Sequence, residues 1–277
     1  YQGYYGILIV TPGQATSQRI TMVKSPQQNP HHPQPRIPRG RRIYAIGDIH
    51  GRLDLLELLH DAILEDAQTA TGKRKTLIHL GDYIDRGPDS FGVVDRLSEF
   101  TNDDFDVINL KGNHEDFLIR FVQNESKLAP LLDVWRNNGC IETLLSYGID
   151  IRDPGEQSPD EEARHIRNLL SDAIPKSHMA FYRNLKLRHT IGDYLFVHAG
   201  INPDLPMNRQ TKTDLIWIRN RFLSHAGPFE KVIVHGHSIS NTPEVLDHRI
   251  GIDTGAYFSN RLTCLVLEDN ERHFIET

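Results

Sequence analysis

Three segments in the first half of the chain share one pattern, namely RRIYAIGDIHG (41–51), TLIHLGDYIDRG (76–87) and DVINLKGNHE (106–115). Each is an apolar run of strand length that ends in glycine followed by a polar side chain. Segments in which apolar residues have helical spacing follow them, at 53–67, 90–100 and 114–123. Strands that alternate with helices are typical of parallel β-units, so the sequence predicts an α/β architecture.

The second half of the chain is expected to be helical at first, at 159–173, and then to return to strands. Those strands are expected at 185–200, 230–237, 248–253 and 261–269. Two of them contain histidine where the strand ends, in VHAG (197–200) and VHGH (234–237). The pattern of polar residues at strand ends therefore continues to the end of the chain.

The polar residues at these strand ends are candidate metal ligands, because the carboxyl ends of strands are where open α/β sheets bind ligands. A single Gly-Asp is more typical of a turn or a helix cap, and a single buried histidine is usually a core residue. Repetition at five strand ends favours a metal site over those alternatives. Carboxylate, amide and imidazole groups without a thiolate fit manganese, iron or zinc.

The motifs GDIHG, GDYIDRG and GNHE, in this order, resemble those of the phosphoprotein phosphatase (PPP) family of dinuclear metallophosphoesterases, in its bacterial and phage branch. The resemblance extends from Arg42 to about Glu268. It includes VHAG, IWIRNRF (216–222), VHGHS (234–238), IDTGAYFSNRLTCLVL (252–267) and the helical segment WRNNGCIETLLSYG (135–148). It implies the calcineurin-like metallophosphoesterase fold, an α/β fold with a central β-sandwich of mixed sheets flanked by helices.

The resemblance also implies which residues bind two divalent metal ions. The implied ligands are Asp48 and His50 for the first ion, Asp82 as the bridge, and Asn113, His198 and His237 for the second ion. Only one histidine of VHGH is expected to bind metal, and the Gly-His pair favours His237. His235 remains an alternative, as a contact of the metal or the phosphate, or as a neighbour of the ligands. Manganese is the expected metal, and iron, zinc or nickel would also suit the ligands.

His114 follows Asn113 directly and is therefore expected beside the metals, where a histidine can protonate the leaving oxygen. Asp85 is expected to orient His114, as a carboxylate orients a catalytic histidine elsewhere. The alternative is that His114 only begins the helix and has no catalytic role. Glu115 is expected to cap that helix, because acidic residues favour the first turn.

Two arginines are expected to bind phosphate oxygens, because guanidinium is planar, charged and able to form paired hydrogen bonds. These are Arg86 and Arg219, and Arg221 is the alternative to Arg219. Trp135 and Trp217 are expected to be packing residues. Tyr257 is expected either to line a substrate groove or to be structural.

Composition limits the class of protein. The 277 residues carry a formal charge of −6, are 38% hydrophobic and 25% charged, and fit a soluble globular chain. No apolar run reaches the length of about 18–20 residues that a membrane helix needs. Two cysteines are too few for a disulfide framework and predict a reducing, cytoplasmic location.

The first 42 residues differ from the rest, with six basic residues, six prolines and no acidic residue. Residues 1–40 are therefore predicted to be a basic, proline-rich leader that is disordered or foreign to the protein. Residues 41–277 are predicted to be a single metallophosphatase domain.

The predicted function is hydrolysis of phosphate monoesters by a hydroxide that bridges two metals and attacks in line. Phosphoserine and phosphothreonine proteins are the preferred substrates, and small phosphoesters are a second possible class of substrate. One alternative is a symmetrical dinucleoside polyphosphate (diadenosine tetraphosphate) hydrolase, which the same ligands would serve. The other is a non-catalytic binding module whose leader docks on nucleic acid or membrane. The complete ligand set disfavours the module, so no nucleic-acid or membrane partner is expected, and the chain is expected to be monomeric.

Overall fold

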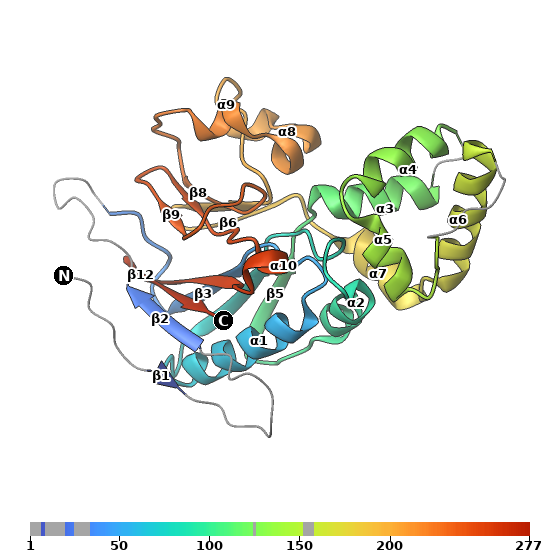
Figure 1. The fold of residues 1–277 in the computed structure, drawn as a ribbon. Coiled ribbons are helices and arrows are strands. Elements are labelled where there is room, and N and C mark those ends of the chain that lie inside the picture. The colour runs from blue at the N-terminus through green and yellow to red at the C-terminus, as the bar shows by residue number, and fades with distance from the viewer. Residues whose placement is uncertain (1–6, 9–19, 25–33, 124–125, 152–157) are drawn as a thin grey trace.

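The computed structural model describes residues 7–8, 20–24, 34–123, 126–151 and 158–277 (Figure 1). The strands of the larger sheet are β1 (Ile7–Leu8), β2 (Ile20–Lys24), β3 (Arg41–Ile46), β4 (Arg74–His79), β5 (Phe105–Asn109), β11 (Thr263–Glu268) and β12 (Glu271–Glu276). Those of the smaller sheet are β6 (Arg188–Ile191), β7 (Tyr194–Val197), β8 (Val232–His235), β9 (Glu244–Val245) and β10 (Arg249–Gly251).

The helices lie outside both sheets (Figure 1). They are α1 (Leu53–Gln68), α2 (Ser90–Glu99), α3 (Asn113–Gln123), α4 (Leu128–Arg136), α5 (Cys140–Ser146), α6 (Pro159–Ala173), α7 (Lys176–Asn184), α8 (Lys212–Trp217), α9 (Asn220–Leu223) and α10 (Ala256–Ser259). Helices α4 to α7 gather at one end of the molecule, and we call them the helical layer. No helix in the described ranges is long and apolar enough to cross a membrane.

Both sheets are mixed. The strand order is β1-β2-β12-β11-β3-β4-β5 in the larger sheet and β6-β7-β8-β10-β9 in the smaller one. Strands β3, β4 and β5 are parallel neighbours, whereas β11 pairs antiparallel with β3. In the smaller sheet β7 and β8 are parallel, and β6 pairs antiparallel with β7. The predicted α/β fold with mixed sheets flanked by helices is confirmed.

The side chains of the central strands alternate between two apolar layers, as the two-residue period of a strand requires. In β3, Ile43 and Ala45 share a cluster with Phe196 of the smaller sheet, so they fill the space between the sheets. Tyr44 and Ile46 face the opposite way and join the cluster of α1, α2 and the helical layer. A third cluster packs α8 and α9 on the outer face of the smaller sheet.

Part of the predicted leader belongs to the fold. Strand β2 pairs antiparallel with β12 at the edge of the larger sheet, and Ile37 is buried between the sheets. The prediction of a disordered leader is therefore wrong for 20–24 and 34–40, because backbone pairing and apolar burial hold these residues. Residues 7–8 also form a strand, β1, which pairs with β2. The remaining residues of the leader lie outside the described ranges.

Two parts of the chain differ from the sequence prediction. The predicted strand segment 185–200 is a hairpin, because the chain turns at Gly192, whose φ is 58°, between β6 and β7. Strand β12 has no counterpart in the sequence prediction, since ERHFIE (271–276) is mostly polar. Its pairing with β11, and not its composition, makes it a strand.

Candidate metal centre

The loops that follow the strands hold five polar residues in a strained backbone. His50, Asp82, Asp85, Arg86 and His237 have φ values of 47°, 52°, 72°, 70° and 62°. Residues other than glycine rarely adopt this left-handed conformation, which costs about 1–3 kcal/mol each. Such a concentration of strain in the loops after β3, β4 and β8 is typical of a functional site.

Two glycines allow carboxylates to approach the backbone closely. A Cβ atom at Gly112 would lie 2.0 Å from Oδ1 of Asp82, and one at Gly236 would lie 2.0 Å from Oδ1 of Asp48. Neither glycine has a positive φ. Space for the carboxylate, rather than backbone freedom, therefore explains both glycines.

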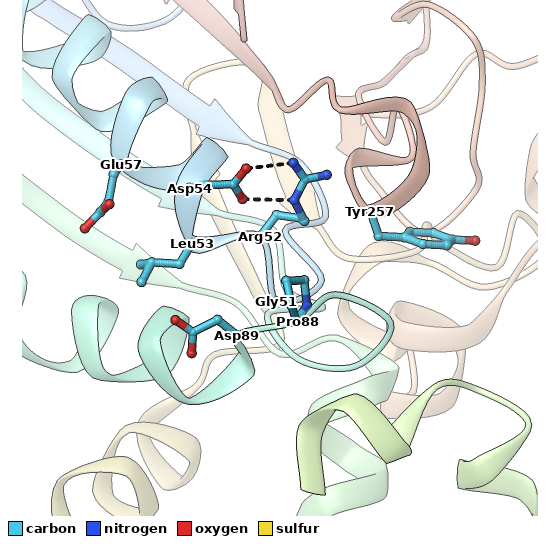
Figure 2. A pocket seen from close by; sticks show the side chains of 8 residues that line it. All are labelled: Gly51, Arg52, Leu53, Asp54, Glu57, Pro88, Asp89 and Tyr257. Atoms are coloured by element: carbon cyan, nitrogen blue, oxygen red, sulfur yellow. Dashed lines mark hydrogen bonds and ion pairs between the residues drawn. The ribbon is translucent and has the colours of Figure 1, made fainter. Parts of the chain in front are cut away.

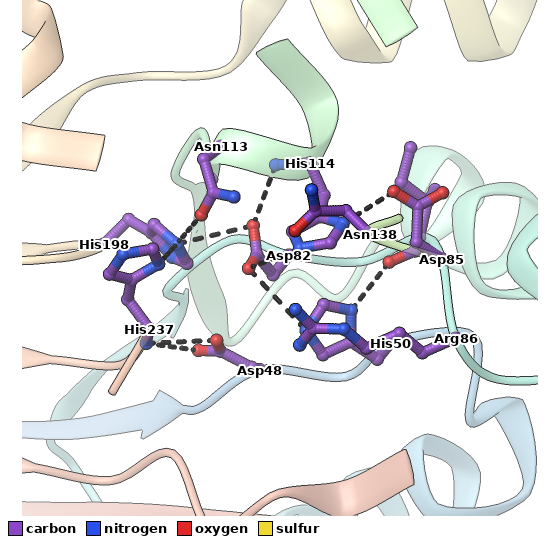
Figure 3. Close-up of polar contacts among 12 residues, drawn as sticks. Asp48, His50, Asp82, Asp85, Arg86, Asn113, His114, Asn138, His198 and His237 are labelled. Atoms are coloured by element: carbon purple, nitrogen blue, oxygen red, sulfur yellow. Dashed lines mark hydrogen bonds and ion pairs between the residues drawn. The ribbon is translucent and has the colours of Figure 1, made fainter. Parts of the chain in front are cut away.

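The first group of candidate ligands is His50, Asp82 and His114, all buried (Figure 3). Nε2 of His50 lies 3.6 Å, and Nε2 of His114 3.7 Å, from Oδ2 of Asp82. Asp48 lies outside this group, and its carboxylate accepts a hydrogen bond of 3.0 Å from the backbone amide of His237. The structure thus brings His50 and Asp82 together, keeps Asp48 nearby and adds His114.

The second group is Asp82, His198 and His237, so Asp82 belongs to both groups. Nε2 of His198 lies 3.4 Å from Oδ1 of Asp82, 3.2 Å from Nδ1 of His237 and 2.9 Å from Oδ1 of Asn113. All the residues expected at the second ion therefore meet here. A carboxylate shared by two buried groups is the geometry that a dinuclear centre requires.

Backbone carbonyls fix the orientation of two of the imidazoles. Nδ1 of His50 donates to the carbonyl of Ile84 at 2.8 Å, and Nδ1 of His198 donates to that of Leu80 at 3.1 Å. In a neutral ring Nε2 then carries a lone pair. Both histidines consequently present an acceptor nitrogen to the centre, which is the arrangement that metal-binding histidines use.

Burial favours the neutral form of His50 and His237. It lowers the pKa of His50 well below its ordinary value and, with His198 nearby, lowers the pKa of His237 to about 2. Nε2 of His198 lies 2.9 Å from Oδ1 of Asn113 and 3.4 Å from Oδ1 of Asp82, so three atoms that can bind a cation converge here. A divalent cation would satisfy all of them.

Two further buried carboxylates lie beside the centre, Asp48 and Asp253. Burial, together with Asp253 and Asp82, raises the pKa of Asp48 well above its ordinary value, and burial also raises the pKa of Asp253. Carboxylates crowded in this way repel one another unless positive ions lie between them. The residues present therefore fit two divalent ions.

The predicted catalytic pair is in direct contact. Nδ1 of His114 donates to Oδ2 of Asp85 at 2.6 Å, and both side chains are buried. Burial would lower the pKa of His114, but Asp82 and the hydrogen bond to Asp85 outweigh it, so the pKa is raised. Because Asp85 holds Nδ1 and Nε2 faces the shared carboxylate of Asp82, the geometry fits the predicted role as an acid.

Arg86 points into the first group. Its Nη1 donates to Nε2 of His50 at 2.7 Å, and its guanidinium carbon lies 5.0 Å from the ring centre of Tyr257. The Tyr257 ring also stands edge-on to His50, with 5.6 Å between ring centres. Arg86 is thus placed where a phosphate oxygen would meet the centre, with an aromatic ring beside it.

The two arginines of IWIRNRF differ in position. Nη1 of Arg219 donates to the carbonyl of His237 at 3.0 Å, so its side chain reaches the second group. Arg221 instead forms an exposed ion pair with Asp204. Only Arg219 of the two is brought to the centre.

The two histidines of VHGH also separate. His237 belongs to the second group, whereas the ring of His235 packs edge-on against Phe222, with 5.0 Å between ring centres. Nδ1 of His235 faces the carbonyl of Gly236 at 3.0 Å, and His235 belongs to neither group. His235 is therefore a buried histidine at a strand end.

Glu115 does more than the predicted helix capping. Its carboxylate accepts from the amide of Gly112 at 2.8 Å, which caps α3, and from the amides of Asp82 and Tyr83 at 3.0 and 2.7 Å. It therefore fixes the loop after β4 against the start of α3, and it holds the shared carboxylate in place.

The family model of calcineurin-like phosphoesterases matches residues 41–268, which is most of the chain. The chain belongs to this family. The phosphoesterase is a metal-dependent hydrolase, and its two buried groups around Asp82 are consistent with a dinuclear centre.

Two bacterial relatives carry the name bis(5'-nucleosyl)-tetraphosphatase PrpE [asymmetrical]. The protein from Oceanobacillus iheyensis is 27% identical over 247 residues, which cover 83% of this chain and 90% of the relative. The protein from Anoxybacillus flavithermus is 25% identical over 240 residues, which cover 79% and 88%.

Solved structures share the fold of the phosphoesterase. A putative diadenosine tetraphosphatase has a TM-score of 0.54 at 22% identity, over 81% of this chain and 88% of the other. A cold-active protein tyrosine phosphatase has a TM-score of 0.52 at 16% identity, over 98% and 97%. At these identities the likeness extends to the fold alone.

Three buried residues near the centre have no functional role in the sequence prediction, namely Trp135, Thr143 and Asp253. Asp253 follows β10, so the pattern of polar residues at strand ends could have identified it. Trp135 and Thr143 lie in α4 and α5, and both contact Asp85 across the fold. No local motif indicates such long-range contacts.

Proposed function

We propose that this phosphoesterase hydrolyses dinucleoside tetraphosphates asymmetrically, into a nucleoside monophosphate and a nucleoside triphosphate. The names of its PrpE-type relatives support this substrate. The observation that carries the proposal is a pocket beside the metal centre, which offers space for a substrate group beyond the phosphate.

The pocket has a volume of about 560 Å³, which suits a small organic ligand (Figure 2). Its lining residues are Gly51, Arg52, Leu53, Asp54, Glu57, Pro88, Asp89 and Tyr257. Gly51 directly follows His50, and Pro88 follows Arg86 by two positions. The same two loops thus form the metal centre on one side and the pocket on the other.

Arg52 fixes the aromatic edge of this pocket. Its guanidinium pairs with Asp54 (Figure 2). It also donates to the carbonyl of Ala256 at 2.8 Å and to Oδ1 of Asn260 at 2.7 Å. These contacts hold α10, and with it Tyr257, beside Arg86. An aromatic ring next to a guanidinium is a suitable surface for a nucleobase attached to phosphates.

The chemistry follows from the geometry of the side chains. When bound, two divalent ions supply Lewis acidity and an activated water. The residues that would hold them are Asp48, His50, Asp82, Asn113, His198 and His237. His114 donates a proton from Nε2 to the leaving oxygen while Asp85 holds Nδ1. Arg86 and Arg219 bind the remaining phosphoryl oxygens.

Phosphorylated proteins are the second candidate substrate. The motifs IWIRNRF and WRNNGCIETLLSYG, which resemble PPP-family phosphatases, favour it, and Arg219 of the first motif reaches the centre. The ligands themselves serve either substrate, because both reactions attack phosphorus.

The test compares kcat/KM for diadenosine tetraphosphate and for a phosphothreonine peptide, with chromatography of the nucleotide products. We expect the dinucleotide to be preferred and to yield AMP and ATP in equal amounts. Formation of two ADP molecules would support the symmetrical alternative. A preference for the peptide would replace the proposal by the phosphatase.

Four properties stay predictions, namely manganese as the metal, a monomeric state, a cytoplasmic location and the lack of nucleic-acid or membrane partners. The enzyme class disfavours the non-catalytic module. Metal analysis of protein purified without added metal, together with light scattering, would test the first two.

A further inference from the structure

The Asp85 carboxylate accepts hydrogen bonds from two residues of the helical layer and from His114. Oδ2 accepts from Nε1 of Trp135 at 2.7 Å as well as from Nδ1 of His114 at 2.6 Å. Oδ1 accepts from Oγ1 of Thr143 at 2.6 Å. The carboxylate is fully buried, so these three groups determine its direction.

The backbone of Asp85 is held by Thr143 as well, together with Ser90. Its amide donates to Oγ1 of Thr143 at 2.8 Å and to Oγ of Ser90 at 3.0 Å, while its φ of 72° is strained. Thr143 therefore binds Asp85 at two points, through the amide and through the carboxylate. A residue in the left-handed region keeps its place only when its surroundings fix it.

Trp135 lies near the end of α4 and Thr143 within α5, both fully buried. The indole of Trp135 has a single polar group, and that group donates to the carboxylate that orients His114. If Trp135 served packing alone, its buried N–H would still need an acceptor, but that acceptor would not have to be the Asp85 carboxylate. The Asp85 side chain thereby connects the helical layer to His114, the proton donor.

We propose that Trp135 and Thr143 are positioning residues that hold Asp85 in the rotamer that orients His114 for proton donation. The proposal rests on the proposed function in that His114 acts as the acid. It implies that the helical layer sets the efficiency of the acid without touching the substrate. Small errors in the orientation of such a group reduce catalysis strongly.

The test uses Trp135→Phe, which keeps an aromatic ring but loses the donor, and Thr143→Val, which keeps the shape but loses the hydroxyl. Thr143→Ser restores a hydroxyl. Tyr182→Phe is the matched control, because it removes a buried hydroxyl of the helical layer that lies 3.2 Å from that of Tyr147.

Each variant is assayed with an alkyl phosphate, whose leaving group needs a proton, and with 4-nitrophenyl phosphate, whose leaving group needs it much less. We expect Trp135→Phe and Thr143→Val to lower kcat about tenfold or more on the alkyl ester. On the nitrophenyl ester we expect little change, with KM and metal content unchanged. Thr143→Ser and Tyr182→Phe are expected to behave like the wild type.

A second readout does not depend on turnover. In ¹⁵N-histidine NMR spectra, the short His114–Asp85 hydrogen bond is expected to give a strongly downfield Nδ1 proton that shifts or broadens in Trp135→Phe and Thr143→Val. Equal losses on both esters with an unchanged NMR signal would overturn the positioning role. If the wild type hydrolyses neither the two esters nor diadenosine tetraphosphate, the proposed function fails while the NMR comparison still tests the contact.

Discussion

His114 can serve this centre in two ways, as a ligand beside His50 and Asp82 or as a proton donor held by Asp85. Because Asp85 holds Nδ1, as a carboxylate orients a catalytic histidine, we expect the donor role. His114→Asn is therefore expected to lower kcat on an alkyl phosphoester by about 10²–10⁴-fold. Steady-state kinetics and elemental analysis of the same preparation measure both roles.

The metal content decides between those roles. If His114→Asn keeps both ions and loses turnover, the residue is the acid. If it loses an ion, His114 is a ligand and the assignment is wrong. The nitrophenyl ester serves as a control, since its better leaving group reduces the effect of losing an acid.

Gly112 is the residue whose replacement should most directly displace Asp82. An alanine Cβ there would lie 2.0 Å from the Asp82 carboxylate and 2.4 Å from its backbone nitrogen. We expect Gly112→Ala to weaken metal affinity by about 10- to 100-fold, as loss of support for a ligand does. Titration of the metal-free protein measures this.

Gly72→Ala is the matched control, because Gly72 has a φ of 73° but nothing within 4 Å of an added Cβ. It should cost stability through its backbone and leave metal affinity unchanged. Equal affinity in Gly112→Ala and the wild type would show that Asp82 can move without loss of the centre.

The sequence predicts the metal ligands better than the residues that hold the site in place. Asp82 and His198 each end a strand, and a strand end is visible in the sequence. Trp135 could be predicted only as a packing residue, because its contact with Asp85 joins positions 50 residues apart. The choice of His237 over His235 rested on a motif, and the structure adds the reason that only His237 lies at the shared carboxylate.

Among the elements, β3, β11 and the loop between α1 and β4 are joined by Glu268, which pairs with Arg42 and Lys73. Burial would raise the pKa of Glu268, but these two cations outweigh it, so the pKa lies below its ordinary value near 4.5. A lowered carboxyl pKa stabilises the fold above pH 4.5, and this contribution disappears as pH falls through the folded pKa.

Glu268→Gln is consequently expected to reduce the free energy of unfolding at neutral pH by about 0.5–1 kcal/mol, because the pair is partly exposed. The difference from the wild type should shrink as the pH falls below 4.5 and through the folded pKa, because the carboxylate becomes protonated. Urea denaturation across this range and at neutral pH measures it. A difference that persists in acid would mean that packing, not charge, is lost.

Elements with strong local signals could be predicted, and elements made by tertiary contacts could not. Helix α6 spans Pro159–Ala173 as predicted, and a capping box of Ser158 and Glu161 marks its start. Strand β2 follows a polar, proline-containing region and is a strand because it pairs with β12. Pairing partners far along the chain are not visible in local composition.

For the whole molecule, metal ions should contribute to stability as well as to activity. Asp48, Asp82 and Asp253 crowd one buried site, and ions bound only by the folded state stabilise it by mass action. Removal of metal by a chelator is expected to abolish turnover and to lower Tm. Adding back ions at a hundredfold excess over Kd should restore about 2.7 kcal/mol per site.

Calorimetry and activity assays with manganese, iron, zinc and nickel measure this effect, and we expect manganese to restore the highest turnover. Metal-free protein with full activity would contradict the dinuclear centre. Calcium, which prefers an all-oxygen site, is a control that should restore neither property.

Residues 34–40, which end the predicted basic leader, contact both sheets. This part of the leader therefore belongs to the fold. The amide of Ile37 donates to the carbonyl of Asp269 at 2.9 Å, in the turn between β11 and β12. The amide of Arg36 donates to the carboxylate of Asp193 at 3.0 Å, in the turn of the smaller sheet. Part of the basic charge also serves the fold, because Arg42 pairs with Asp66 and Glu268.

Since Ile37 is 1% exposed and lies in the cluster between the sheets, Ile37→Ala should destabilise the protein by about 2–5 kcal/mol. Leu169→Ala, at a leucine that is 40% exposed on α6, is the control and should cost less than about 0.5 kcal/mol. The turnover of the folded fraction should not change, because neither residue touches the metal centre. Equal stabilities of the two variants would mean that residues 34–40 lie on the sandwich without holding it together, and the leader would then be the appendage that its composition suggests.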